Sequence, residues 1–176
     1  MKPGEYVTSD HHFGHRNIIQ YCDRPFKGIN HMDEFMIARW NERVPKGAIV
    51  YHLGDLSLHS ARYVHRLNGR IRLVLGNHDK IRGGDRDKFD WIKSYYESKT
   101  VDGIKVVMCH YPFHTWNASH HGSWHLHGHC HGTVDGGKYN RLDVGVDAHQ
   151  FIPLSYYQVR SIMEKKGQLT EHHHDL

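Results

Sequence analysis

Side chains that bind divalent cations recur in this sequence directly after short apolar runs. They are carboxylates, a carboxamide and imidazoles, which offer the oxygen and nitrogen atoms that transition metals bind in proteins. Seven of them form the candidate ligand set: Asp10, His12, Asp55, Asn77, His110, His129 and His131. Short apolar runs predict buried strands, and ligands of α/β proteins bind just beyond the carboxyl ends of strands. The pattern therefore predicts a metal site at one edge of a sheet.

The charge of this ligand set indicates what the metal site would bind. Two divalent cations carry four positive charges, of which Asp10 and Asp55 neutralise two and a bridging hydroxide a third. The remaining positive charge and the open coordination positions suit a phosphate ester. Because the set offers oxygen and imidazole ligands without a thiolate, we expect manganese, iron, nickel or zinc rather than magnesium or calcium, with manganese favoured.

Two pairs of candidate ligands share one spacing: Asp10 and His12 are two residues apart, and so are His129 and His131. In an extended backbone, residues two apart point to the same side, so each pair is expected to face the metals together. Cys130, between the members of the second pair, is then expected to face away. Glycines beside the ligand positions allow tight turns without an obstructing side chain: Gly54, Gly76 and Gly128.

Strands and helices alternate along the chain, which is the pattern of an α/β domain. Six apolar runs predict the strands: 6–9, 49–53, 71–75, 104–108, 124–126 and 142–146. Apolar residues at helical spacing predict three helices: 32–44, 60–67 and 155–166. Asp33 and Glu34 fall in the first turn of the first helix, where the helix dipole favours negative charge. Asp102 and Gly103 predict a tight hairpin that joins 95–101 to the next strand.

The composition indicates one domain over residues 1–176, with a frayed tail at 170–176. Its 20 histidines favour metal coordination. No apolar run is long enough to span a membrane, and the start of the chain does not resemble a signal peptide. Three cysteines without a CxxC spacing suit a reducing compartment, so we expect a cytoplasmic protein. A net charge of +4 suits an anionic substrate but does not indicate a dedicated nucleic-acid-binding module.

Five short motifs occur in order between residues 10 and 131, and their order resembles that of the calcineurin-like metallophosphoesterases. They are Asp10-His11-His12, Gly54-Asp55, Gly76-Asn77-His78-Asp79, His110 and Gly128-His129-Cys130-His131. A single motif would be unspecific, whereas five in order are specific. The stretch 9–15 further resembles small bacterial and phage members of the family. The resemblance implies a four-layer α/β/β/α sandwich.

The resemblance also implies a role for each motif residue. One metal would be held by Asp10, His12 and His131. The other would be held by Asn77, His110 and His129, with Asp55 bridging the two. His78 is similar to the family histidine that contacts the phosphate and protonates the leaving oxygen. The continuation Leu56-Ser57-Leu58 lacks the acidic and arginine residues of the protein Ser/Thr phosphatases, which argues against a protein substrate and against the usual aspartate partner of that histidine.

These roles imply a metal-dependent phosphoric ester hydrolase in which a metal-bound hydroxide attacks the phosphorus and His78 assists as a general acid. The leading hypothesis is a phosphodiesterase that acts on a small or nucleotide-type substrate. One alternative is a phosphomonoesterase or a nucleotide pyrophosphatase. Another is a non-catalytic scaffold on the same fold.

Four further residues are candidates for substrate contact: His15, Arg16, Asn17 and Trp116. The first three follow the first ligand pair, where they could either reach the phosphate or begin a helix. Trp116 belongs to the loop 111–124, which is expected to rim the site. It could stack on a base or an aromatic leaving group, or it could pack against the body of the domain.

Overall fold

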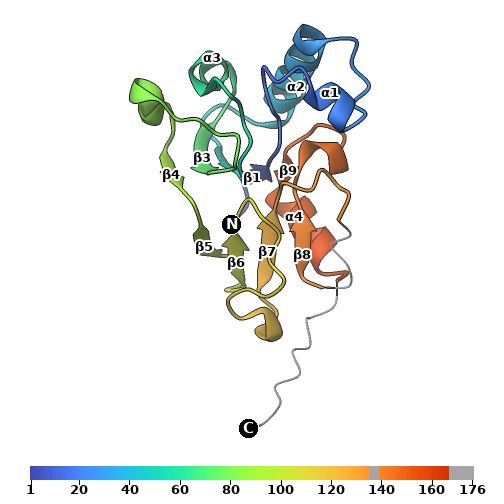
Figure 1. Ribbon diagram of the computed structural model, residues 1–176. Helices are drawn as coiled ribbons and strands as arrows, with labels where there is room; N and C mark the ends of the chain where they lie inside the picture. The colour runs from blue at the N-terminus through green and yellow to red at the C-terminus, as the bar shows by residue number, and fades with distance from the viewer. Residues whose placement is uncertain (135–138, 167–176) are drawn as a thin grey trace.

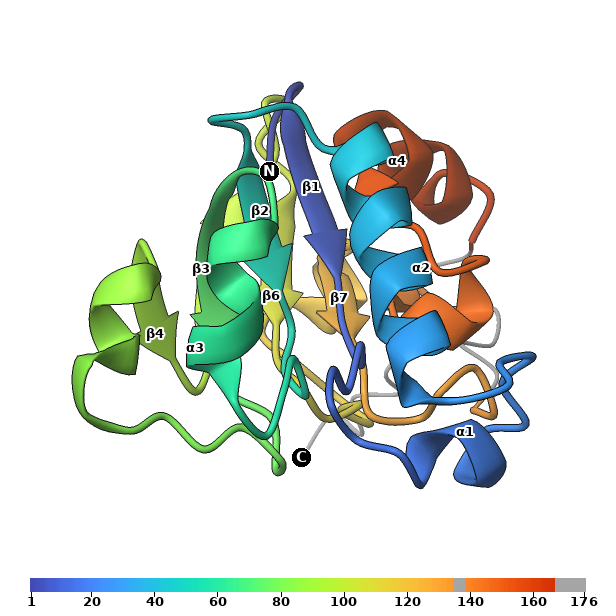
Figure 2. The ribbon, with the colours of Figure 1, turned by 90° about the horizontal axis from the view of Figure 1, so that it is seen from above.

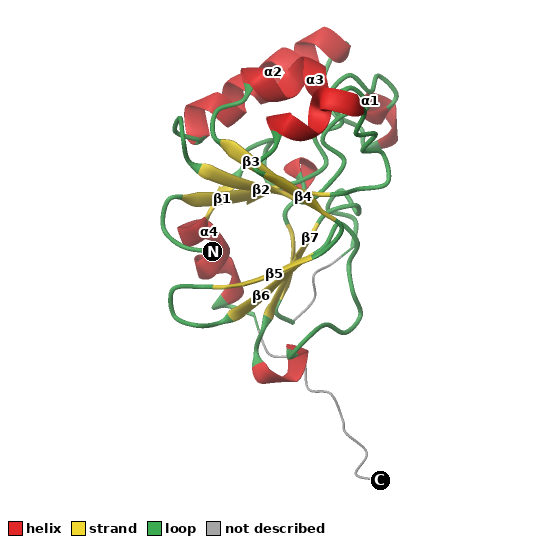
Figure 3. Cartoon of the chain, turned by 90° about the vertical axis from the view of Figure 1, so that its left-hand side faces the viewer, coloured by secondary structure: helices red, strands yellow, loops and turns green. Residues whose placement is uncertain are grey.

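The computed structural model describes residues 1–134 and 139–166 of the protein, so the tail predicted at 170–176 lies outside the described residues. The described chain forms two β-sheets that face each other (Figure 1). Helices lie over the outer face of the first sheet, as the side view in Figure 3 shows. The α/β class predicted from the sequence is confirmed.

The first sheet contains five strands in the order β4-β3-β2-β1-β9. Their bounds are Glu5–Thr8 for β1, Ile49–His52 for β2, Arg70–Val74 for β3, Trp91–Lys93 for β4 and Leu154–Ser155 for β9. Strands β1 to β4 run parallel, and β9 pairs with β1 in the antiparallel direction. The carboxyl ends of β1, β2 and β3 therefore meet at one edge.

The second sheet contains four strands in the order β5-β6-β7-β8. Their bounds are Tyr96–Lys99 for β5, Lys105–Met108 for β6, Trp124–His127 for β7 and Arg141–Asp143 for β8. Strands β5 and β6 form the hairpin predicted around Asp102 and Gly103, and β6, β7 and β8 run parallel. The ends of β6 and β7 deliver the remaining predicted ligands.

Helices α2 and α3 lie over the first sheet (Figure 2). The α-helices are α1 (Ile18–Tyr21), α2 (Ile29–Arg43), α3 (Ser60–Tyr63) and α4 (Tyr156–Met163), and the 3-10 helices are η1 (Val64–Arg66), η2 (Gly83–Lys88), η3 (Ser119–His121) and η4 (Val146–Ala148). One core joins the helical layer to the first sheet, with Trp40 of α2 and Leu73 of β3 fully buried. A second core contains the inner faces of both sheets and Val159 of α4.

A loop covers the outer face of the second sheet beside β7. The ring of His125 in β7 is fully buried and stacks on Phe113, with 5.0 Å between ring centroids and an interplanar angle of 6°. Arg141 Nη1 donates a hydrogen bond to the Phe113 carbonyl at 3.0 Å. This part of the outer face is thus covered by a loop. Among its described residues, the only helix is the short η3.

Several features of the secondary structure differ from the sequence prediction, among them the predicted strand 142–146, which ends at Asp143 before η4 begins at Val146. Helix α2 begins at Ile29, so Asp33 lies beyond the first turn. Asp33 is buried and accepts hydrogen bonds from the Tyr63 hydroxyl and the Gly14 amide, which fixes the helix to its neighbours. The predicted helix 60–67 is divided into α3 and η1, and β4 and β9 had not been predicted.

None of the helices in the described segments combines the length and the apolar character that a crossing of the lipid bilayer requires.

Candidate metal centre

The loops that follow β1, β2, β3, β6 and β7 meet at one edge of the two sheets. Backbone hydrogen bonds join them: the amide of Asp10 donates to the Gly54 carbonyl at 3.0 Å, and the amide of Gly128 donates to the His110 carbonyl at 3.0 Å. The His12 amide donates to the Asp55 carbonyl at 2.9 Å. All seven predicted ligands are brought to this edge.

The first cluster consists of Asp10, His12 and His131, whose potential ligand atoms all lie within 4.8 Å of one another. The imidazole rings of His12 and His131 stack with 5.2 Å between their centroids. His12 Nε2 is buried and has no hydrogen-bond partner among the described residues. A buried nitrogen without a partner is costly, so this atom indicates a ligand that binds there.

The second cluster consists of Asp55, His110 and His129, again with potential ligand atoms within 4.8 Å of one another. His110 Nε2 lies 3.0 Å from Asn77 Oδ1 and 3.2 Å from His129 Nδ1. The other nitrogen, His110 Nδ1, lies 2.8 Å from the Leu53 carbonyl oxygen. Because a carbonyl only accepts hydrogen bonds, Nδ1 carries the proton and Nε2 presents a lone pair to the cluster.

Asp55 connects the two clusters. Its Oδ2 lies 3.4 Å from His12 Nε2 in the first cluster and 3.5 Å from His110 Nε2 in the second. Its Oδ1 accepts a hydrogen bond from the His78 amide at 2.9 Å, which fixes the orientation of the carboxylate. Asp55 therefore lies where a ligand shared by two cations would have to lie.

The backbone at the ligands corrects the expectation from residue spacing. Positive φ angles occur at five of the seven predicted ligands: Asp10 (61°), His12 (53°), Asp55 (56°), His129 (71°) and His131 (48°). The paired ligands converge through left-handed conformations rather than through an extended backbone. Each such residue costs about 1–3 kcal/mol and persists only where its surroundings hold it.

Cys130, which lies between the second pair of predicted ligands, was expected to face away from the site. Because His129 and His131 are in the left-handed region, the alternation of an extended strand does not apply to the residue between them. Cys130 is one of the residues that line the pocket, together with the predicted ligands His129 and His131.

Two glycines permit the close approach of the carboxylates. A Cβ atom at Gly76 would overlap Asp55 Oδ1, and one at Gly128 would overlap Ser9 Oγ and Asp10 Oδ2. At Gly54 the backbone also has a φ of +93°, which disfavours any other residue. The glycines predicted to allow tight turns are therefore required by the packing of the ligands themselves.

Asp79 holds the second and third motifs together, a role that the sequence did not reveal. Its carboxylate accepts hydrogen bonds from the amides of Asp55 (2.8 Å), Leu56 (2.9 Å) and Gly76 (2.9 Å). These three contacts stabilise the left-handed turn at Asp55. The position of Asp79 at the end of the Gly76-Asn77-His78-Asp79 motif was the only available signal.

Arg24, which is buried, forms an ion pair with the partly buried Asp147 behind the first cluster, and no local sequence pattern indicates this pairing. The guanidinium donates to both Asp147 oxygens at 2.8 Å and to the carbonyls of Asp10 (2.7 Å) and His11 (2.9 Å). Asp147 Oδ2 also lies 2.7 Å from His131 Nδ1. One arginine thus supports both the loop that carries Asp10 and the carboxylate that orients His131.

Cys22 adds a third group of potential ligand atoms with His131 and Asp147. The guanidinium of Arg24 contacts both oxygens of this carboxylate, so a cation there would meet a fixed positive charge. We therefore assign Asp147 to the orientation of His131 rather than to a third cation.

Burial dominates the electrostatics of the site. Burial raises the pKa of the Asp10 carboxyl to about 7. Burial, with the charges of His131 and Arg24, lowers the pKa of His12 to about 2, and burial also lowers the pKa of His110. Burial alone would lower the pKa of His131, but hydrogen bonds to Asp147 and Cys22 outweigh it and raise that pKa to about 10. His12 and His110 are therefore neutral at pH 7, the form in which imidazole binds a metal.

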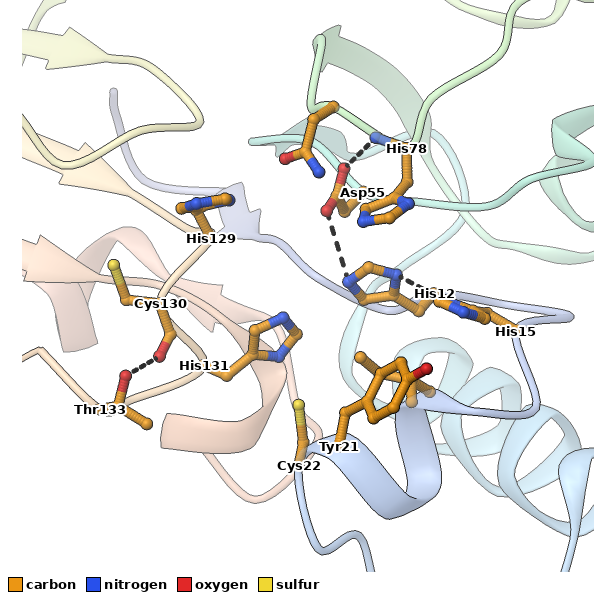
Figure 4. Close-up of a pocket in the computed structure, with 12 residues that line it drawn as sticks. His12, His15, Tyr21, Cys22, Asp55, His78, His129, Cys130, His131 and Thr133 are labelled. Atoms are coloured by element: carbon orange, nitrogen blue, oxygen red, sulfur yellow. Dashed lines mark hydrogen bonds and ion pairs between the residues drawn. The ribbon is translucent and has the colours of Figure 1, made fainter.

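A pocket of about 670 Å³ opens over both clusters. The candidate general acid, His78, lines it together with His15, and their ring centroids are 5.6 Å apart. The His78 ring also lies 5.2 Å from that of His12 (Figure 4). Among the described residues no carboxylate is hydrogen-bonded to the His78 ring.

The other candidate substrate residues are placed differently. Arg16 and Asn17 are exposed at the start of α1 and do not line the pocket. Trp116 is buried against His125, with 5.3 Å between ring centroids, and its indole N–H donates to the Ser123 carbonyl at 3.2 Å. Trp116 therefore packs against the body of the domain, because its ring covers the second sheet. The alternative, stacking on a substrate, does not fit this position.

Comparisons with known proteins identify relatives of the whole chain. Uncharacterized protein MJ1445 of Methanocaldococcus jannaschii is 33% identical over 172 residues, covering 91% of each chain. The gene 66 protein of Mycobacterium phage D29 is 30% identical over 85% of this chain and 91% of its own length. No protein-family model matches the sequence.

Solved structures place the chain among known folds. A protein of unknown function from Aquifex aeolicus, AQ665, superposes with a TM-score of 0.73 at 23% identity, covering 92% of this chain and 100% of its own. Vps29 of Entamoeba histolytica, solved with zinc, is a distant neighbour with a TM-score of 0.39 at 14% identity, covering 72% of this chain and 64% of its own.

Proposed function

The chain belongs to the family of the archaeal protein MJ1445, and we propose that it is a metal-dependent phosphoesterase of the calcineurin-like type that binds two divalent cations. The observation that carries the proposal is the pair of three-residue clusters joined by Asp55. The way in which the residues divide between the two clusters agrees with the two ligand sets that the family resemblance implies. Asn77 completes the second set, since its Oδ1 lies 3.0 Å from His110 Nε2.

The atoms at the centre of the site fit cations. His110 Nε2 presents a lone pair to Asn77 Oδ1 and Asp55 Oδ2, which are themselves acceptors. His12 Nε2 likewise faces Asp55 Oδ2 without a hydrogen bond. Lone pairs that face one another repel unless a positive charge lies between them, and oxygen and imidazole donors suit manganese, iron, nickel or zinc. The left-handed backbone at five of the ligands supports the same assignment, because such strain concentrates at functional sites.

The four-layer arrangement is part of this proposal. The helices over the first sheet and the two facing sheets supply three of its layers. The loop that covers His125, with helix η3, would occupy the position of the fourth.

The chain's own residues would divide the chemical work between binding and proton transfer. When bound, two divalent cations would supply a nucleophilic water of lowered pKa and neutralise charge on the phosphoryl oxygens. The ion pair of Arg24 and Asp147 orients His131, and Asp79 fixes Asp55, so the proposed ligands are held before substrate arrives. His78, on the pocket wall, would donate a proton to the leaving oxygen.

Metal-dependent hydrolysis of bis-p-nitrophenyl phosphate tests the proposal. Protein stripped with a chelator is expected to be inactive, and Mn²⁺ is expected to restore activity as two ions bind per chain. His114→Ala, which removes an exposed histidine outside the pocket, should behave like the wild type. Hydrolysis that persists without any metal, or a protein that binds no ion, would refute the proposal.

Asp147→Asn is expected to weaken metal binding about 10- to 100-fold, because the substitution removes the charge that orients His131. Isothermal titration with Mn²⁺ should show the loss for one of two sites, since Asp147 contacts only the first cluster. Asp87→Asn, at an exposed aspartate of η2, is the matched control. Equal affinities in both variants, with both folded by circular dichroism, would remove Asp147 from this role.

A further inference from the structure

The pocket is larger than the proposed metal chemistry requires. Its volume of about 670 Å³ is in the range of sites for small organic ligands. One side of it is lined by five of the seven proposed metal ligands together with His15 and His78. Five lining residues have no part in that chemistry: Ile18, Tyr21, Cys22, Cys130 and Thr133. This second side is available for the organic part of a substrate.

Tyr21 is the most prominent residue of this second side. Its side chain lines the pocket although 72% of the residue is exposed to solvent. Ile18, three residues earlier in α1, also lines the pocket, but it is only 4% exposed and packs in the first core, so it forms the base of this side and Tyr21 its exposed surface. In Figure 4 Tyr21, the last residue of α1, and Cys22, which follows it, lie below His12 and His131. An exposed aromatic ring on a pocket wall offers a surface on which a planar group can stack.

The position of Tyr21 relative to the metal centre is fixed by Arg24. The Arg24 amide donates to the Ile19 carbonyl at 2.8 Å, which closes the end of α1. Its buried side chain bonds to Asp147 and to the carbonyls of Asp10 and His11. The end of α1 is thus anchored to the backbone that carries the metal ligands. A group bound against Tyr21 would therefore lie at a defined position relative to the phosphate.

The charge of the lining limits how many phosphates a substrate could carry. Among the described residues that line the pocket there is no lysine or arginine, and Asp55 is the only carboxylate. A second or third phosphate outside the metal centre would find no positively charged partner there. This favours a substrate with one phosphate over a nucleoside diphosphate or triphosphate.

From these observations we infer that Ile18 and Tyr21 form a subsite for the planar, uncharged arm of a phosphodiester, such as an aryl group or a nucleobase. The inference rests on the proposed function, because the phosphate is placed by the metal centre. It narrows the substrate class to diesters with a single phosphate, and it makes Tyr21 a specificity-determining residue.

Two non-hydrolysable probes that differ in their organic arm, phenylphosphonate and methylphosphonate, test the subsite. Calorimetric titration into the Mn²⁺-loaded protein should show that phenylphosphonate binds about 5- to 100-fold more tightly. Tyr21→Ala should remove this preference and leave methylphosphonate affinity unchanged, whereas Tyr21→Phe should keep it. Tyr157→Ala, at a tyrosine that is 64% exposed on α4, is the matched control and should also keep it.

The outcomes separate this inference from the proposed function. Equal binding of the two phosphonates by the wild type, or an undiminished preference in Tyr21→Ala, would overturn the subsite while metal-dependent hydrolysis stands. If the metal-loaded protein binds neither phosphonate and hydrolyses no diester, the proposed function fails and the subsite with it. ATP hydrolysis at a higher kcat/KM than that of bis-p-nitrophenyl phosphate would contradict the restriction to one phosphate.

Discussion

Asp55→Asn is expected to abolish metal-dependent hydrolysis of bis-p-nitrophenyl phosphate. Asp55 is the residue that reaches both clusters, with Oδ2 at 3.4 Å from His12 Nε2 and 3.5 Å from His110 Nε2. The substitution keeps the size of the side chain but removes one of the two carboxylate charges that the proposed cations share. The neutral amide of the asparagine would no longer neutralise part of the cations' charge, so the two cations would repel each other more strongly.

The measurement is a pair of titrations, one of metal binding and one of activity. We expect the variant to bind fewer than two Mn²⁺ ions per chain and to show no metal-dependent rate above background. Its circular dichroism spectrum should match the wild type, because the contacts that fix the turn are made by the backbone amide of Asp55. Full activity in this variant would remove Asp55 from the metal centre.

His78→Ala is expected to lower kcat about 10²- to 10⁴-fold while both metal ions remain bound. His78 lines the pocket, and its contact with Asp55 is made through its backbone amide, which the substitution keeps. The loss should depend on the leaving group. Diphenyl phosphate, whose leaving phenol needs a proton more than p-nitrophenol does, should lose more activity than bis-p-nitrophenyl phosphate.

This dependence separates proton donation from simple binding of the phosphate. A residue that only binds phosphate would lower the rates of both substrates by the same factor. Equal losses for the two diesters would therefore assign His78 to binding, and an unchanged kcat would exclude it from the reaction.

The sequence predicted which ligands would meet, but not how the backbone presents them. Asp10 and Asp55 each follow a strand of the first sheet, and parallel strands bring such residues to one edge. His110 follows β6 of the second sheet, and it joins them because the two sheets face each other. The local conformation was wrong because the period-two argument assumes an extended backbone. At Asp10 and His131 the backbone is left-handed, a conformation that hydrogen bonds from distant residues stabilise and local spacing cannot reveal.

The supporting residues show the same limit. Arg24 and Asp147 are 123 residues apart in the sequence, and no local pattern joins them. In the sequence, Arg24 is only a basic residue near the first motif. Asp147 is only an aspartate that follows the last strand of the second sheet. Trp116 shows the reverse case, since an aromatic residue in a loop beside the site was compatible with both stacking and packing. Only the position of His125 beneath it decides between them.

Anomalous diffraction from crystals grown with Mn²⁺ tests the central claim most directly. With data collected at the manganese absorption edge, we expect two peaks at the floor of the pocket. One should lie among Asp10, His12 and His131, and the other among Asn77, His110 and His129, with Asp55 in contact with both. Crystals of active protein that show no manganese at these residues, or that show it bound elsewhere, would contradict the account.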